Sequence, residues 1–167
     1  AIRSILNRCQ MHRQWWINDP DCLMLRDTDT KLNDHERFAL INAAIITAGM
    51  GVFSDDLAKI SDETFATIAH IKALADACDN GRPYPLDFMQ HPMPEVIYND
   101  AGYLAVFNFA DDEKRKILHR SGKLKEILPE GAKLVDVWKQ TMMTVEGERF
   151  SLGTFPAHSS RLFRIVD

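Results

Sequence analysis

The sequence predicts an α/β region followed by an all-β region, and two observations support this fold class. In the first half, apolar residues recur at helical spacing between short apolar runs that lie next to carboxylates. In the second half, apolar and polar residues alternate with a period of two, which is typical of half-buried strands. The change falls at residues 79–85, a stretch rich in proline and turn-forming residues. We therefore expect two domains, residues 1–82 and residues 83–167.

Composition narrows the class of protein. The chain has 167 residues, a formal net charge of -4, and 46% hydrophobic and 26% charged residues, as in an ordinary globular protein. The negative charge argues against a nucleic-acid partner, and each apolar run is too short for a membrane span. Three widely spaced cysteines without a Cys-x-x-Cys pair favour a reducing, cytoplasmic compartment over a disulfide framework. The six histidines lack metal-ligand spacing, so we expect neither a metal nor a cofactor.

The first two predicted helices differ in how clearly their ends are marked. Residues 1–13 carry apolar side chains at roughly helical spacing, so the chain is expected to open inside a helix. The second helix should begin after Asn33, whose side chain is placed to cap the first turn, with Glu36 returning the bond as a capping box. This helix is expected to continue to about Ala48.

The rest of the first half should add one strand and one helix. Residues 49–54 are short, apolar and glycine-led, which suits a buried strand, and Asp55 and Asp56 follow it. Ser61 should begin a helix over residues 64–78, because acidic residues directly after it suit the positive end of a helix. The order strand, helix, strand, helix matches the last two units of a parallel β/α barrel of the TIM type.

The second half is expected to form a small antiparallel β-sandwich. Residues 95–98 and 103–109 form a predicted hairpin, because residues 99–102 are turn formers that tolerate a positive φ. Short strands at regular spacing, separated by turn signals, are typical of such sandwiches. The further strands are expected at residues 116–119, 132–138, 141–145, 149–152 and 160–166.

One stretch, residues 15–23, resembles a binding site. It places two tryptophans, an asparagine and two carboxylates around a single proline. Proline disfavours a helical conformation of the preceding residue, so Asp19 and Asp21 are expected at a strand end, held by a stiff turn. Carboxylates accept hydrogen bonds from hydroxyl groups, and flat indole rings can cover the apolar face of a sugar. The stretch therefore predicts contact with a carbohydrate.

Each of these residues also has a purely structural interpretation. Asp21 could cap backbone N–H groups of the turn, and Asp19 could be buried and bonded to amides. Trp15 and Trp16 could belong to the hydrophobic core. Cys22 is expected to form a small apolar wall, since nothing near it in sequence would activate a thiol nucleophile.

The segment 16–23, together with Leu25, Arg26 and residues 54–57, resembles glycoside hydrolase family 36, the melibiase-type α-galactosidases. The block Asn-Asp-Pro-Asp at residues 18–21 carries most of this resemblance. Residues 155–163 are in addition similar to the closing strands of that family's C-terminal β domain. The resemblance implies that residues 1–82 are the incomplete C-terminal end of a catalytic barrel.

That resemblance implies retaining hydrolysis of terminal α-galactosides by two carboxylates about 5 Å apart. The strands that carry the two carboxylates in relatives are not recognisable here, so no catalytic residue is assigned. The resemblance implies sugar contact by Asp21 and Cys22, with Asn18, Asp19 and Trp16 as support. We therefore expect the chain, an inactive fragment by itself, to belong to an enzyme acting on α-galactoside oligosaccharides and to be capable of forming a homo-oligomer.

Two alternatives remain open at this point. The parent enzyme could have a sibling specificity on the same barrel, such as α-N-acetylgalactosaminidase or a raffinose-type galactosyl transferase. From a different class, the chain could be a non-catalytic carbohydrate-binding or interaction β module, whose front helices serve only for packing.

Overall fold

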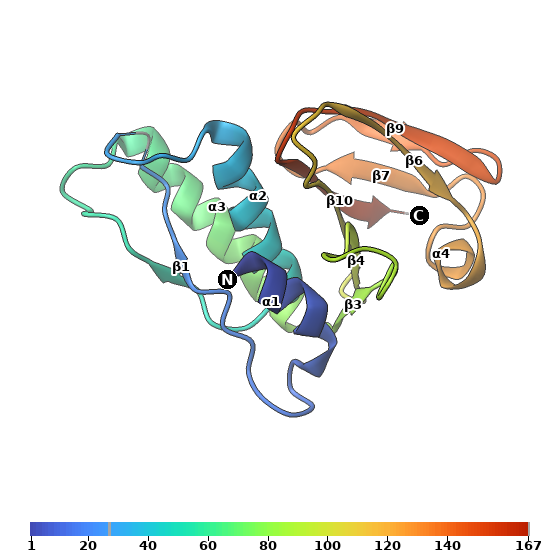
Figure 1. Cartoon of the computed structure of the whole chain (residues 1–167), viewed down its shortest axis with the longest axis horizontal. Helices are drawn as coiled ribbons and strands as arrows, with labels where there is room; N and C mark the ends of the chain where they lie inside the picture. The colour runs from blue at the N-terminus through green and yellow to red at the C-terminus, as the bar shows by residue number, and fades with distance from the viewer. Residues whose placement is uncertain (27, 167) are drawn as a thin grey trace.

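The computed structural model describes residues 1–26 and 28–166, and Figure 1 shows a helical half beside a half made of antiparallel strands. The helical half contains the predicted helices and two short strands. Its helices are α1 (Ile2–Arg8), followed by a 3-10 turn (Cys9–Met11), α2 (Asp34–Thr47) and α3 (Asp62–Asp79). Among the described residues, no helix is long and apolar enough to cross a membrane.

The two long helices begin where the sequence predicts. The Asn33 side chain accepts the backbone N–H of Glu36 at 3.0 Å, and the Glu36 carboxylate accepts the N–H of Asn33 at 2.9 Å. The predicted capping box is therefore confirmed, because both halves of the reciprocal pair are present. Ser61 likewise caps α3 by accepting the backbone N–H of Thr64 at 3.1 Å.

The two front strands are parallel and very short. Strand β1 (Cys22–Leu23) pairs with β2 (Val52–Phe53), and α2 connects them, so the predicted order strand, helix, strand, helix is observed. The predicted strand over residues 49–54 is reduced to two paired residues, and it is not buried, because Val52 is 42% exposed. Within residues 1–26 and 28–166 these are the only parallel strands, so a closed barrel is not evident.

The second half contains two antiparallel sheets. Six strands pair in the order β3-β4-β5-β10-β7-β8, and β6 pairs with β9. The predicted hairpin is confirmed, since Val96 pairs with Val106 and Asn99 with Tyr103 across the turn. The strands are β3 (Pro83–Pro85), β4 (Val96–Asn99), β5 (Tyr103–Asn108), β6 (Lys114–His119), β7 (Lys133–Asp136), β8 (Met142–Thr144), β9 (Arg149–Phe155) and β10 (Ser159–Val166).

The six-stranded sheet is buried on both faces at its centre. One face packs against β6, β9 and α4 (Gly122–Ile127), with Leu104 and Phe163 in that core. The other face packs against α2, with Ala105 and Phe107 in a second core. Residues 104–108 are consequently all buried. The expectation of a half-buried strand is therefore wrong for β5, because helices cover the face that would otherwise meet water.

Polar contacts also join the helical half to the sheet. The Trp138 indole N–H donates to Asn42 Oδ1 at 2.8 Å, and the Asn42 amide donates to Ser160 Oγ at 2.8 Å. The Asn99 amide donates to the carbonyl oxygens of Ile46 and Cys78 at 3.2 and 3.0 Å. The domain division at residues 82 and 83 remains a prediction, and the two sides of that position share one hydrophobic core.

Three elements differ from expectation. The helix expected over residues 1–13 ends at Arg8, where the chain tightens into the 3-10 turn. Strand β3 lies in the proline-rich stretch that the sequence marks only as a boundary; its antiparallel pairing with β4 makes it the outer strand, where a missing N–H is tolerated. Helix α4 has six residues and is held by burial of Leu124, a tertiary contact that periodicity alone does not predict.

Candidate functional site

The predicted site is built around Asn18, which is fully buried. Its amide group donates to the carbonyl oxygens of Cys9 and Thr47 at 3.0 and 2.8 Å. Its Oδ1 accepts the indole N–H of Trp16 at 3.1 Å. A buried amide with every polar group paired fixes its neighbours in place. Asn18 therefore ties its own loop both to the 3-10 turn and to the C-terminal end of α2.

His12 supports the backbone of Asn18. The His12 ring is buried, and its Nδ1 accepts the Asn18 backbone N–H at 3.1 Å. The other ring nitrogen lies 3.1 Å from Asp79 Oδ1. Because Nδ1 is an acceptor, a neutral ring carries its proton on Nε2 and donates it to Asp79. The Arg13 Nε–H, 3.2 Å from Nε2, then makes no true hydrogen bond to that nitrogen.

Asp79 is ionised and paired. Burial raises its pKa, but the hydrogen bonds from Arg13 and His12 and the charge of Arg13 outweigh burial and hold the pKa of Asp79 below its ordinary value. Arg13 Nη2 donates to Asp79 Oδ2, so both carboxylate oxygens have a donor. The last residue of α3 is thus tied to the segment that carries the candidate site.

Gly49 is required where α2 leads into β2. A Cβ atom at this position would lie 2.1 Å from the Asn18 carbonyl oxygen, and the backbone has a φ of +102°. Both observations exclude a side chain here. Beside it, the Met50 N–H donates to the same carbonyl at 2.9 Å. The approach of these two backbones determines where the Asp-Pro-Asp turn begins.

The two candidate carboxylates form a tight turn and point one oxygen each into the backbone. Asp19 Oδ1 accepts the Asp21 N–H at 2.9 Å, and Asp21 Oδ1 accepts the Cys22 N–H at 2.7 Å. Asp21 has a φ of +73°, a left-handed conformation that aspartate tolerates better than most residues. Both side chains are exposed, and their Oδ2 atoms have no hydrogen-bond partner among the described residues. These oxygens can accept from a ligand.

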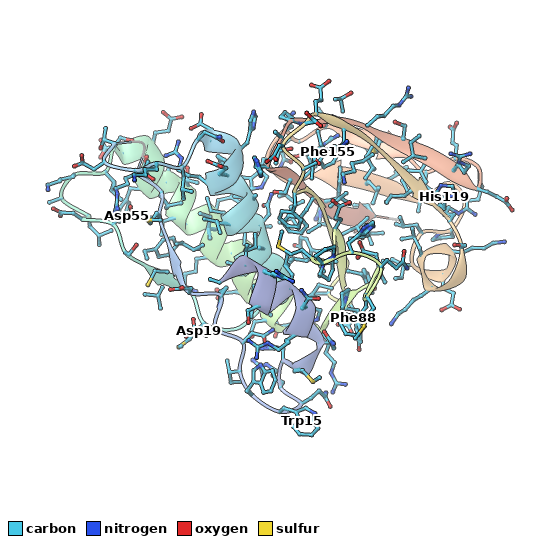
Figure 2. The ribbon with its side chains drawn as sticks, in the orientation of Figure 1. Trp15, Asp19, Asp55, Phe88, His119 and Phe155 are labelled. Atoms are coloured by element: carbon cyan, nitrogen blue, oxygen red, sulfur yellow. The ribbon has the colours of Figure 1, made fainter. Side chains whose placement is uncertain are left out.

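The position of this turn differs from the prediction. Asp19 and Asp21 precede β1, so they lie at its N-terminal end, whereas Asp55 follows β2 at the opposite end of the two-stranded sheet. Figure 2 shows Asp19 and Asp55 well apart. The buried Asp55 carboxylate accepts the backbone N–H groups of Leu25 and Arg26 at 2.7 and 3.2 Å and therefore closes a turn.

A hollow of about 420 Å³ lies beside the turn. Trp16, Asp19 and Asp21 line it together with Ile17 and residues of α1. The Trp16 ring is 42% exposed, and the Arg8 guanidinium carbon lies 5.9 Å from its centre. The structure therefore gathers three of the five candidate residues around one hollow, with an aromatic wall and two carboxylates.

The remaining residues of the stretch have distinct environments. Trp15 is 79% exposed at the tip of the loop in Figure 2, so the expectation of a core tryptophan is wrong for both indoles. Cys22 is exposed and free, and it does not line the hollow. Asn18 is buried beneath the turn. Asn18 can therefore position the turn but cannot contact a ligand directly in this arrangement.

Sequence reasoning missed His12, Thr47 and Gly49. Gly49 carried a signal, because a glycine directly after a predicted helix often marks a constrained backbone. His12 and the Thr47 carbonyl carried none, since their roles arise from contacts with Asn18 across six and 29 positions of sequence. Among the described residues, no group of three or more His, Cys, Asp or Glu side chains could hold a metal ion.

Comparison with known proteins shows that several solved glycoside hydrolases contain a similar fold. No family model matches the chain. The structure is similar to α-galactosidase I from Mortierella vinacea, with a TM-score of 0.65 and 17% identity over 98% of this chain and 43% of that chain. A family 27 β-L-arabinopyranosidase from Geobacillus stearothermophilus gives a TM-score of 0.68 and 15% identity over 98% of this chain and 40% of that chain.

A third similar structure is the α-galactosidase from Saccharomyces cerevisiae, with a TM-score of 0.64 and 14% identity over 99% of this chain and 51% of that chain. The chain thus spans about half the length, or less, of the enzymes it resembles. At these identities the likeness shows a shared fold. That fold is a small mixed α/β unit with antiparallel sheets.

Proposed function

We propose that this chain is the C-terminal part of a retaining glycoside hydrolase that releases terminal α-linked galactose from oligosaccharides. The Asp19-Pro20-Asp21 turn carries the proposal, because it presents two unpaired carboxylate oxygens beside a tryptophan at one hollow. The similarity of fold to α-galactosidases along nearly the whole chain supports it. The Asn-Asp-Pro-Asp block favours family 36, whereas a structural neighbour belongs to family 27.

In this proposal β1, α2, β2 and α3 are the last two units of a (β/α)8 barrel, and residues 83–167 form its C-terminal β-sandwich domain. The parallel pairing of β1 and β2 through a helical crossover supports the assignment. Parallel strands are normally buried on both faces. The exposure of Val52 is then explained, because the neighbouring barrel strands would cover it.

The proposed roles follow from the contacts. Asp21 and Asp19 accept hydroxyl groups of the sugar through Oδ2, and Trp16 covers an apolar ring face. Asn18 positions the turn from below, and Cys22, which lies outside the hollow, is given no contact with the sugar. The catalytic carboxylates are proposed to lie on earlier barrel strands, so this chain alone should not hydrolyse a glycoside.

Two other functions stay in consideration. The β-L-arabinopyranosidase neighbour favours a sibling specificity, because it has a similar fold and is named for a different sugar. A non-catalytic carbohydrate-binding module is favoured by the sandwich, which has its own hydrophobic core. Hydrolysis of a chromogenic α-galactoside by the complete protein would distinguish the enzyme from such a module.

The experiment on this chain is a titration with galactose, followed by amide chemical shifts in NMR. We expect shifts in residues 16–22, weaker shifts with glucose, and their loss in Asp21→Asn, which keeps a residue tolerant of the left-handed conformation. Asp112→Asn, an exposed carboxylate on the sandwich, is the matched control. In the complete enzyme, Asp21→Ala should lower kcat/KM by roughly 10- to 100-fold, because one charge-assisted hydrogen bond is lost, and Asp21→Asn should have a milder effect.

The opposing outcomes are equally specific. Turnover of a chromogenic α-galactoside by this chain alone, abolished by Asp19→Asn or Asp21→Asn, would make that pair catalytic and refute the proposed roles. Shifts that spare residues 16–22, or that survive in Asp21→Asn, would make Asp21 a turn residue only.

A further inference from the structure

A second hollow, of about 300 Å³, lies between the first turn of α2 and the strands β7, β9 and β10. Phe155 marks its position at the junction of the two halves in Figure 2. The Asn18 turn contacts the other end of α2, at Thr47. Because α2 has 14 residues, the two hollows lie roughly 20 Å apart along its axis. The second hollow is therefore separate from the candidate sugar-contact turn.

The walls of this hollow are aromatic and held in place. Trp138 is fixed by its indole hydrogen bond to Asn42, by a stacked contact with His70 at 5.1 Å, and by an edge contact with Phe38 at 5.1 Å. Phe155 is fully buried and forms part of the lining. Rigid aromatic walls of this kind bind a flat ring at little entropic cost.

The charged groups of the hollow leave an excess of positive charge. The buried Asp136 is satisfied, since Oδ1 accepts the N–H groups of Trp138 and Lys139 at 3.0 Å and Oδ2 accepts Arg161 Nε at 2.8 Å. Asp34 is paired with Arg37. Lys139, which also lines the hollow, has no carboxylate partner among the described residues. One cation thus remains available to a ligand.

Arg161 provides a second donor. Its Nε and Nη1 atoms are bonded to Asp136 and to the Leu152 carbonyl, and its guanidinium lies 4.8 Å from the centre of the Phe163 ring. Nη2 has no hydrogen-bond partner within residues 1–26 and 28–166. A guanidinium held on three sides presents its free N–H groups in a fixed direction, which suits a carboxylate.

Two of the three hydroxyl groups in the lining, those of Ser159 and Ser160, are already engaged. Ser159 Oγ donates to the Pro156 carbonyl at 2.7 Å, and Ser160 Oγ accepts from Asn42 at 2.8 Å. A sugar ring would need several such groups for its hydroxyls, whereas an aromatic ring needs only apolar walls. We propose that this hollow binds a small aromatic carboxylate, with its ring against the partly exposed side chains of Phe38 and Trp138 and its carboxylate at Lys139 and Arg161.

Phenylacetate is a suitable probe, because its ring and carboxylate match the hollow in size and charge. Trp138 becomes the only tryptophan in a Trp15→Phe, Trp16→Phe background, since the chain has three. We expect phenylacetate to change Trp138 emission saturably. Calorimetry on the unaltered chain should give a similar dissociation constant. Phenylacetamide, which lacks the charge, and glucuronate, a sugar acid, should bind at least about fivefold more weakly.

Two variants test the location. Lys139→Glu should weaken phenylacetate binding at least about fivefold, whereas Lys125→Glu, an exposed lysine on α4, should leave it unchanged. Thr154→Phe should fill the hollow and abolish binding without lowering the melting temperature. Equal affinity for phenylacetamide, preference for glucuronate, or equal effects of Lys139→Glu and Lys125→Glu would each overturn the proposal.

Discussion

The two halves of the molecule differ in how completely they bury their own apolar side chains and pair their own strands. In the sandwich, β5 and β10 run side by side over six paired positions, and Leu104, Phe155 and Phe163 close a core of their own. In the helical half, two strands of two residues each pair only with one another. Most of the large exposed apolar side chains belong to this half: Trp15, Trp16, Ile17, Met50, Val52, Leu57 and Phe65.

This difference indicates that the helical half requires a further surface, whereas the sandwich does not. Single exposed apolar residues are normal, but a concentration of them marks an interaction site. What keeps the helical half ordered is its contact with the sheet through α2 and the buried polar ties at Asn18 and Asn99. The following predictions test this contrast.

The largest effect is expected from the buried asparagines. Asn18→Ala removes the donor to the Thr47 carbonyl and one of the two donors to the Cys9 carbonyl, and it should lower the free energy of unfolding by about 3 kcal/mol. Asn108→Ala is the matched change in the sandwich, where the amide donates to Phe155 and Pro156 carbonyls. Hydrogen exchange should show the helical half opening alone in Asn18→Ala. Equal exposure of both halves in the two variants would contradict the contrast.

Self-association is the next expected effect. We propose that the chain forms homo-oligomers through the helical half, because an unpaired strand edge and apolar side chains meet water there. Leu57→Lys with Phe65→Lys should shift the sedimentation distribution toward monomer by roughly tenfold in concentration. The control is Ile117→Lys with Met142→Lys, exposed apolar residues of the sandwich. A stronger effect of that control pair would place the contact on the other half.

A smaller effect is expected from Asp79. Its folded-state pKa lies below the ordinary value of 3.8, so its pairing contributes stability above that value and loses it as the pH falls through the folded-state pKa. Asp79→Asn should therefore lower the melting temperature at neutral pH but make little difference at a pH below the folded-state pKa of Asp79. Asp76→Asn, an exposed neighbour paired with Lys72, should have almost no effect at either pH. A constant loss at all pH values would exclude the ion pair as its cause.

The smallest effect concerns thiol reactivity. Burial raises the pKa of Cys9 and of Cys78 to about 12, whereas Cys22 is exposed. At about pH 8, Ellman's reagent should react rapidly with one thiol in the folded chain and with two more only after unfolding. Cys22→Ser should remove the rapid phase. A rapid phase from Cys9 would show that the 3-10 turn opens in solution.

Prediction from sequence succeeded where the signal was local. The capping box at Asn33 and the cap at Ser61 each depend on side chains three residues apart. The β-hairpin depends on four turn residues and an alternating pattern on either side. It gave no bounds for β1, because the position of that strand depends on which residues meet Val52 and Phe53. The apolar loop residues and the strand residues look alike in sequence.

The sequence by itself determined the order strand, helix, strand, helix of the first half, the caps of α2 and α3, and the chemical character of the Asp-Pro-Asp turn. Only the tertiary structure decided that Trp15 and Trp16 are exposed, that β5 is buried on both faces, and that His12, Thr47 and Gly49 support Asn18. Local patterns show which residues share one face of a helix or strand. They do not show which distant segment covers that face, because that contact is made only when the whole chain packs.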